Sequence, residues 1–365
     1  MINFFNIYKQ DKSKLQKNLN DLKKIIKKTN FINGKEVQEF EKNFAKFCNT
    51  RYAVGCNSGS DALFLAIKAL NLKKNSEVLI PAQTYCSTLF AVLRANLKPV
   101  LVDIQNLNPT MSLQELRKKI TKKTSAIIIV HLYGECCNFK KLKQIIKNKK
   151  IHIIEDAAQA HGAKDYSLNK KGFVAGSMGI LGCFSFYPGK NLGAYGDGGA
   201  VTTNSKKLYI KLLKLRNLGG INKYEHDIVG FNSRLDTIQA AILINKLKSL
   251  NNNNRKRQKI AQFYNNNITN KLIKKINYSR GCVYHQYVIL SKKEKKIQNL
   301  LKKNKIQYGK HYPKPLHKLN AVKKYFSSQS YPNAEFFSKY GISLPIDPNL
   351  KKNQLIKICR VLNSI

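Results

Sequence analysis

One lysine of this sequence stands in a setting unlike that of most others. Lys190 follows Pro188 and Gly189 and precedes a glycine-rich turn, whereas many other lysines lie beside further lysines. A pocket with few charges would lower the pKa of its amine, and a neutral amine is the nucleophile that forms a Schiff base with a carbonyl group. Most lysines of this chain must be solvated, so Lys190 alone does not establish this chemistry.

Two other positions lie at the ends of predicted elements, where ligands are commonly bound. The apolar pair at 153–154 predicts a strand that ends in Glu155 and Asp156, which places a carboxylate at the edge where open α/β sheets bind ligands. Gly59 and Ser60 open an amphipathic helix whose free N–H groups could hold a phosphate. Each feature also has a simpler explanation, because aspartate and serine are common helix caps.

Short apolar runs alternate with helical patterns over the first part of the chain. This alternation predicts an α/β fold with a mostly parallel sheet and right-handed crossovers. The runs are rich in β-branched residues, as is typical of strands buried on both faces. We expect strands at 52–55, 77–80, 99–102, 126–130 and 152–154, and helices at 12–30, 37–47, 61–71, 86–96, 112–120 and 139–148.

The second half of the chain has a different pattern. Two further strands are predicted at 184–187 and 199–203, joined by a glycine-rich loop. A long helical pattern covers 233–266, and its asparagine-rich middle is either a break or a solvated helical segment. Shorter and more polar elements follow. We therefore expect a large α/β domain over 1–245 and a smaller C-terminal α+β domain over 246–365.

The composition is strongly basic. The 365 residues include 66 Lys and Arg against 20 Asp and Glu, a formal net charge of +46 at pH 7. These basic residues are spread over almost every segment, beside abundant asparagine. A nucleic-acid surface would gather them on one face, so we attribute them to a composition-wide bias and expect no nucleic-acid partner. The positive field would still favour anionic substrates such as nucleotide sugars.

Other classes of protein are excluded by simple counts. The 43% hydrophobic content is too high for a disordered chain. The eight cysteines form no C-x-x-C pair, so neither a metal site nor a redox motif is predicted. No apolar run approaches the roughly 18 residues of a membrane span, and the N-terminus is too polar for a signal peptide. We expect a cytoplasmic protein without membrane contact.

Seven motifs occur along the chain in an order that resembles a known family. They are GKEVQEFE at 34–41, PAQTYCST at 81–88, HLYG at 131–134, EDAAQ at 155–159, FSFYPGK at 184–190, GFNSRLD at 230–236 and HYPKPLH at 311–317. Together they resemble the fold-type I pyridoxal-phosphate aminotransferases and, more narrowly, the DegT/DnrJ/EryC1/StrS family of nucleotide-sugar aminotransferases. The resemblance implies a mostly parallel sheet sandwiched by helices, with a smaller C-terminal domain.

The resemblance also implies roles for individual residues. Lys190 would hold pyridoxal 5′-phosphate (PLP) as a covalent Schiff base and move a proton, and Asp156 would pair with the pyridine nitrogen. Gln159 would lie beside the 3-hydroxyl group, while Ala158 and Tyr85 would cover the two faces of the ring. The groups that would hold the phosphate are Gly59, Ser60, Ser185 and, from the neighbouring subunit, Asn232. A homodimer with shared active sites is therefore implied.

Four further residues match positions that contact the nucleotide diphosphate or the sugar in similar enzymes: Arg234, His311, Tyr312 and His317. A guanidinium suits a diphosphate because its planar fork donates two hydrogen bonds. His311 and Tyr312 lie in a loop expected to come from the other subunit, and His317 could instead be a capping or packing residue. Two positions depart from the family pattern, with Leu218 in place of a common hydrogen-bond donor and Glu135 in place of a common glutamine.

The function implied by the resemblance is PLP-dependent transamination of a keto-sugar nucleotide, with L-glutamate as amino donor. The KYEH run at 223–226, before the GFNSRLD motif, is most similar to that of enzymes that aminate C3 of dTDP-3-keto-6-deoxyhexoses, so this reaction is implied. A UDP-3-keto-N-acetylglucosaminuronate or a 4-keto-6-deoxyhexose nucleotide is the alternative substrate. Lysine at 190, where some members have histidine, favours transamination over dehydration. A non-catalytic PLP-binding regulator is the alternative class of protein, supported only by the net charge.

Overall fold

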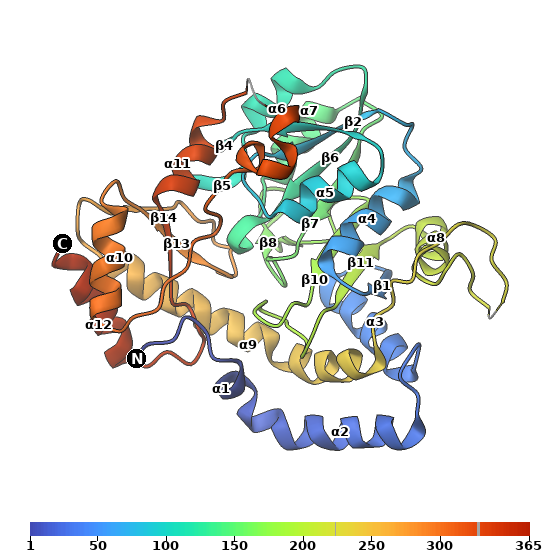
Figure 1. Ribbon diagram of the computed structural model, residues 1–365, viewed down its shortest axis with the longest axis horizontal. Coiled ribbons are helices and arrows are strands. Elements are labelled where there is room, and N and C mark those ends of the chain that lie inside the picture. Colours follow the sequence, from blue (N-terminus) through green and yellow to red (C-terminus); the bar gives the residue numbers. More distant parts are fainter. Residues whose placement is uncertain (223, 327–328) are drawn as a thin grey trace.

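The computed structural model describes residues 1–222, 224–326 and 329–365, so Lys223 of the KYEH run lies outside the described residues. Seven of the described strands form one central sheet (Figure 1). In spatial order they are β1 (Tyr52–Cys56), β11 (Gly199–Thr203), β10 (Leu181–Ser185), β7 (His152–Asp156), β6 (Thr124–Val130), β2 (Glu77–Pro81) and β3 (Lys98–Val102). β11 runs antiparallel to both its neighbours, and the other pairs are parallel. The predicted α/β fold with a mostly parallel sheet is confirmed.

Apolar side chains from this sheet pack on both of its faces. Along β6, Ile127 and Ile129 lie in the core cluster that contains Leu116 and Leu142, whereas Ile128 lies in the cluster of Leu63. Successive residues of a strand point to opposite faces, so both faces must be covered and the strand is apolar throughout. The covering helices are α3 (Lys35–Cys48), α4 (Gly59–Leu70), α5 (Cys86–Arg94), α6 (Leu113–Lys119), α7 (Phe139–Ile146) and α8 (Lys206–Arg216).

Two elements differ from the sequence prediction for identifiable reasons. β10 covers Leu181–Ser185 instead of 184–187. The strand begins earlier because Gly182 has no side chain and can lie directly against Gly176. A Cβ on Gly182 would be only 2.4 Å from the Cα of Gly176. The long helix α9 (Thr237–Asn267) continues without a break through its asparagines. Asn254 is buried there and donates to the carbonyl of His161, so tertiary hydrogen bonds hold this segment in the helix.

The C-terminal part has its own small sheet and core. Its sheet joins β12 (Lys274–Lys275), β13 (Tyr287–Leu290) and β14 (Gly341–Leu344), with α10 (Glu294–Lys303), α11 (Pro332–Tyr340) and α12 (Lys352–Asn363) around it. Ile2, from the other end of the chain, belongs to the same core cluster. The division at 245 and 246 stays a prediction, and that boundary lies within α9.

The remaining elements are short or peripheral. The N-terminal α1 (Ile7–Asp11), a 3-10 turn at Lys12–Lys14 and α2 (Leu15–Lys28) lead to the large sheet, and α2 runs beside α9 (Figure 1). Two hairpins pair β4 (Ile104–Gln105) with β5 (Asn108–Met111) and β8 (Lys164–Asp165) with β9 (Phe173–Val174). Further 3-10 turns lie at Leu132–Gly134, Leu316–Lys318 and Asn320–Tyr325. Among the described residues, no helix has the length and apolar character needed to cross a membrane.

Candidate active site

A cavity of about 350 Å³ lies where the predicted site residues meet. It opens at the carboxyl ends of β7 and β10, which end in Asp156 and Ser185. These strands are adjacent and parallel, so both residues reach the same edge of the sheet. The predicted residues that line this one cavity are Gly59, Ser60, Tyr85, Asp156, Ala158, Gln159, Ser185, Lys190, His311 and Tyr312.

Asp156 is a buried carboxylate with two hydrogen-bond donors. Its Oδ2 accepts from the hydroxyl of Thr88 at 2.8 Å, and its Oδ1 accepts from the N–H of Ala158 at 3.2 Å. Burial raises the pKa of Asp156, and these hydrogen bonds partly oppose that effect. Because both donors leave the carboxylate in place beside the cavity, it can pair with a protonated nitrogen of a bound ring. Sequence reasoning did not find Thr88, whose type gives no sign of this contact.

Lys190 lies in the turn that follows β10. Its backbone N–H donates to the carbonyl of Tyr187 at 2.9 Å, which fixes the start of the glycine-rich loop. Removal from water lowers the pKa of the Lys190 amine to about 8, although the charge of Asp156 acts in the opposite direction. A large fraction of this amine is therefore neutral near pH 8, as covalent attachment to an aldehyde requires.

The start of α4 forms a cradle that fits a phosphate. The side chain of Ser58 caps the helix by accepting from the N–H of Asp61 at 3.1 Å, and the first N–H groups of a helix have no partner within it. A Cβ at Gly59 would lie 2.5 Å from the Cβ of Ser185, so glycine is required for this close approach. The hydroxyl of Ser60 lies 2.6 Å from that of Ser87, a cavity residue that sequence reasoning missed.

The loop that carries His311 and Tyr312 reaches the cavity of its own chain. Gln159 donates to the Tyr312 hydroxyl at 2.7 Å and accepts from the N–H of Tyr133 at 2.8 Å. The hydroxyl of Tyr133 in turn donates to the carbonyl of His311. The expectation that this loop comes from the other subunit is therefore wrong in this structure, because a loop of the C-terminal part folds back over the sheet edge within one chain.

Aromatic rings surround the mouth of the cavity. The ring of Tyr85 is 54% exposed and lies 5.4 Å, centroid to centroid, from the ring of Tyr312. Burial of the Tyr312 hydroxyl raises its pKa, so this group stays protonated near neutral pH. Because Tyr85 is half-exposed and lines the cavity, its ring is available to stack on a flat ligand there.

Three predicted residues lie outside the set that lines the cavity. Asn232 is exposed and forms an isolated β-bridge with Asn217, which also accepts from the guanidinium of Arg234 at 3.1 Å. His317 is buried, with its Nε2 at 3.0 Å from Glu335 and its ring packed on Tyr331. His317 is therefore a packing residue in this structure. Asn232 and Arg234 lie outside the cavity of their own chain.

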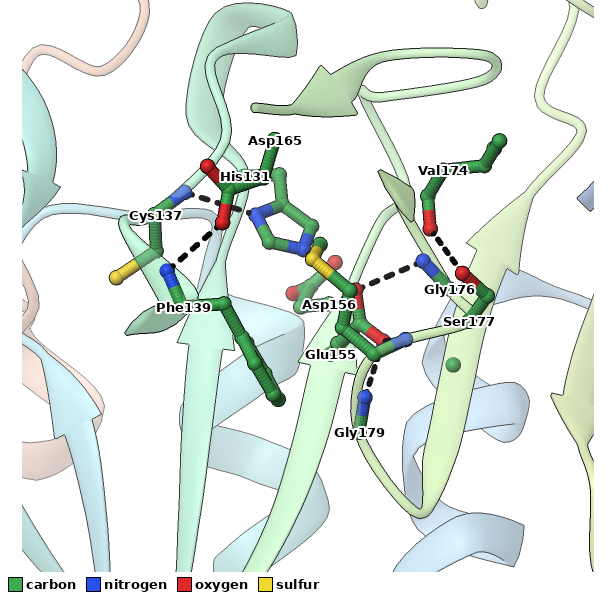
Figure 2. Close-up of polar contacts among 12 residues, drawn as sticks. His131, Cys137, Phe139, Glu155, Asp156, Asp165, Val174, Gly176, Ser177 and Gly179 are labelled. Carbon is green, nitrogen blue, oxygen red and sulfur yellow. Dashed lines mark hydrogen bonds and ion pairs between the residues drawn. The ribbon is translucent and has the colours of Figure 1, made fainter. Parts of the chain in front are cut away.

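Behind Asp156 lies a buried polar cluster that the sequence did not predict (Figure 2). Glu155 accepts from the N–H groups of Gly176, Met178 and Gly179, which holds the loop before β10 against the end of β7. The Nδ1 of His131 accepts from the N–H of Cys137, so its Nε2 carries the proton that is shared with Glu155 at 2.9 Å. His131 and Glu155 are not among the residues that line the cavity, and their hydrogen bonds fix the strand end that presents Asp156.

The described residues include no group of three or more His, Cys, Asp or Glu side chains that could hold a metal ion. The eight cysteines are all free thiols. Among the polar groups of the cavity, the Lys190 amine, the Asp156 carboxylate, the hydroxyls and the helix N–H groups match an aldehyde, a ring nitrogen and a phosphate on one planar ligand. Asp197, His285 and Gln286 line the cavity as well.

Comparison with known proteins then gives the family. The sequence pattern of the DegT/DnrJ/EryC1/StrS aminotransferase family matches residues 12–363. The chain belongs to this family. It is an enzyme of the nucleotide-sugar aminotransferase type, as the motifs predicted.

Individual relatives agree with this assignment. A dTDP-3-amino-3,6-dideoxy-α-D-galactopyranose transaminase of Aneurinibacillus thermoaerophilus is 37% identical over 339 residues, which are 91% of each chain. The solved structure of DesV from S. venezuelae is 33% identical and superposes with a TM-score of 0.95, covering 100% of this chain and 98% of that one. The structure of NtdA from Bacillus subtilis, solved with bound cofactor PMP, is 27% identical with a TM-score of 0.89, covering 96% and 82%.

Proposed function

We propose that this enzyme uses PLP to transfer the amino group of L-glutamate to a keto-sugar nucleotide. The observation that carries the proposal is that Lys190 and Asp156 line one cavity beside the start of α4. Asp156 ends β7, and Lys190 lies in the turn that follows the adjacent parallel strand β10. An amine with a lowered pKa, a buried carboxylate and free helix N–H groups in one cavity fit the aldehyde, ring nitrogen and phosphate of PLP.

The residues of this chain would then divide the work. Bound PLP supplies an electron sink for bond breaking at the amino-bearing carbon. The carboxylate of Asp156 would keep the ring nitrogen protonated, held in position by Thr88 and Ala158. Lys190 also lines this cavity, so its amine would carry a proton between the substrate and the ring. The N–H groups at Gly59 and Ser60 would anchor the phosphate.

We propose amination at C3 of a dTDP-3-keto-6-deoxyhexose as the specific reaction. The relative from A. thermoaerophilus, which is named a dTDP-3-amino-3,6-dideoxy-α-D-galactopyranose transaminase, supports this choice. A UDP-linked 3-keto uronate and a 4-keto-6-deoxyhexose remain the alternatives to be tested beside it.

A homodimer with shared sites forms part of the proposal. PLP, a sugar diphosphate and glutamate bring several negative charges, whereas Lys190 is the one lysine or arginine among the described residues that line the cavity. Arg234 and Asn232 lie outside their own cavity, in a segment with the exposed apolar residues Ile221 (53% exposed) and Val229 (89% exposed). A two-fold dimer would bury these residues and bring Arg234 and Asn232 to the partner's cavity.

The decisive test is a panel of keto-sugar nucleotides incubated with the PLP-loaded enzyme and L-glutamate. We expect 2-oxoglutarate and an amino-sugar nucleotide in equal amounts by mass spectrometry, with the 3-keto-6-deoxyhexose turned over fastest. Lys190→Ala should abolish both products. Loss of a sugar hydroxyl without consumption of glutamate would instead establish dehydration. Salt-sensitive binding of duplex DNA with no turnover would establish the regulator.

A further inference from the structure

The N-terminal segment is tied to the C-terminal part of the chain and crosses the mouth of the cavity. Ile2 is buried, and its backbone donates to the carbonyl of Lys305 at 2.8 Å and accepts from the N–H of Gln307 at 2.9 Å. The N–H of Phe4 donates to the side chain of Gln307 at 2.8 Å, and that of Asn6 donates to Asp347 at 2.8 Å. These bonds on either side fix the position of residue 5.

The two phenylalanines of this segment have different surroundings. The ring of Phe4 stacks on His311, with centroids 5.8 Å apart and planes 20° apart. The ring of Phe5 also lines the cavity but is 47% exposed, and its Cζ lies 3.9 Å from where a Cβ on Gly189 would be. The N-terminal segment, which is bound to the C-terminal part, therefore places Phe5 beside Gly189, the residue that precedes Lys190. The exposed part of the Phe5 ring is an apolar surface next to the cavity.

We propose that Phe5 is a specificity-determining residue that covers the apolar side of the sugar ring. This inference rests on the proposed function, because the keto carbon must lie close to the Lys190 amine for transfer to occur. Phe5 lies beside the turn of Lys190, so the part of the substrate next to Phe5 would be the sugar that carries the keto carbon. The nucleotide is attached to another carbon of that sugar and would lie farther from Lys190. Covering a half-exposed aromatic ring with C–H groups is favourable.

The same contact distinguishes between candidate sugars. A 6-deoxyhexose presents a methyl group, which gains by leaving water against Phe5. A uronate presents a carboxylate, which would lose its hydration beside an aromatic ring. The carboxylate of Asp197, which also lines the cavity, adds like-charge repulsion. The N-terminal segment would thus favour the deoxy sugar.

The experiment measures KM and kcat separately for the keto sugar and for L-glutamate. Phe5→Ala should raise the KM for a 3-keto-6-deoxyhexose nucleotide about tenfold, because the sugar would lose an apolar contact equal to roughly half the burial of an aromatic side chain. The KM for glutamate should stay within about twofold of the wild-type value. Phe5→Tyr keeps the ring and should restore the wild-type KM. Tyr8→Ala removes a 66% exposed ring of the same segment that does not line the cavity, and serves as the matched control.

Each other result overturns the inference. An unchanged sugar KM in Phe5→Ala would show that the ring does not touch the sugar. Equal effects on both substrates, or weaker dimerisation in sedimentation, would show that Phe5 supports the Lys190 turn or the partner subunit. If the wild-type enzyme turned over no keto-sugar nucleotide at all, the proposed function would fail first, which is a distinguishable outcome.

Discussion

At the scale of single residues, Lys190 and Asp156 show how burial sets reactivity. The amine loses hydration and its pKa falls to about 8, while the carboxylate loses hydration and its pKa rises. The nearby opposite charge opposes each change but does not cancel it. A neutral amine and a carboxylate supported by two hydrogen bonds can therefore occupy the same cavity.

The pKa of Lys190 leads to a prediction for the apoenzyme. Because the neutral amine is the nucleophile, the rate at which added PLP becomes covalently attached should rise about tenfold per pH unit below pH 8 and level off above it. Stopped-flow visible absorbance measures this rate. A rate that continued to rise to pH 10, near the ordinary lysine pKa of 10.5, would contradict the effect of burial.

The buried side chain of Glu135 gives a prediction about stability. Burial raises its pKa to about 7 from 4.5, although Ser279 donates to it from both its N–H and its hydroxyl. Between these two values the unfolded chain releases the proton and the folded chain retains it, so stability falls as pH rises through this window. The loss is complete roughly one pH unit above the folded-state pKa, with an upper limit of about 3 kcal/mol.

Glu135→Gln should remove this pH dependence, because an amide oxygen can accept from Ser279 without carrying a charge. We expect the variant to exceed the wild type by about 1–3 kcal/mol at pH 8 and to differ little at pH 4.5, measured by urea unfolding. Glu39→Gln, at an exposed position, is the control. Equal stability of Glu135→Gln and wild type at pH 8 would contradict the account.

The sequence predicted the residues that carry recognisable chemistry and missed those that act through position. Lys190 and Asp156 stood out because glycine and proline flank the first and a strand precedes the second. Thr88 and Ser87 are ordinary residues of a helix start, and only the packing of α5 against the sheet edge brings them to the cavity. The prediction that the His311 loop enters the cavity of the other subunit was wrong, because a sequence does not show which copy of the chain a loop contacts.

At the scale of elements, the start of α4 depends on the absence of a side chain at Gly59. Gly59→Ala would place a Cβ 2.5 Å from that of Ser185 and force the helix and β10 apart. The N–H of Gly59 and the hydroxyl of Ser185 would hold the same phosphate, so moving them apart should weaken binding of PLP. We expect the affinity for PLP to fall at least about tenfold while the circular dichroism spectrum stays unchanged. Gly196→Ala, which meets only the flexible end of Gln239 at 3.0 Å, is the control. Unchanged affinity in Gly59→Ala would contradict the cradle.

The elements themselves were predictable where the apolar pattern was continuous. Strands such as β2 and β6 are buried on both faces and have no competing pattern. The start of β10 was missed because Gly182 weakens a strand pattern, although it is required for the approach to Gly176. The asparagine-rich part of α9 could not be decided from local propensity, because hydrogen bonds from distant residues stabilise it.

At the scale of the whole molecule, the proposed dimer leads to a complementation experiment. Lys190→Ala and Asn232→Ala should each be nearly inactive as homodimers. If Asn232 acts on the partner's cavity, a mixed dimer contains one site with both changes and one intact site. Equal mixing should then restore about a quarter of the wild-type activity. Activity equal to the average of the two separate variants would contradict shared sites.

The central claim, that Lys190 holds PLP in a cavity built for amino transfer, is tested most directly by the visible spectrum of the PLP-loaded protein. We predict that L-glutamate removes the absorbance of lysine-bound cofactor and that a keto-sugar nucleotide then restores it. Lys190→Ala should lack this absorbance from the start. A wild-type spectrum that does not respond to glutamate, or no bound cofactor after incubation with PLP, would contradict the account.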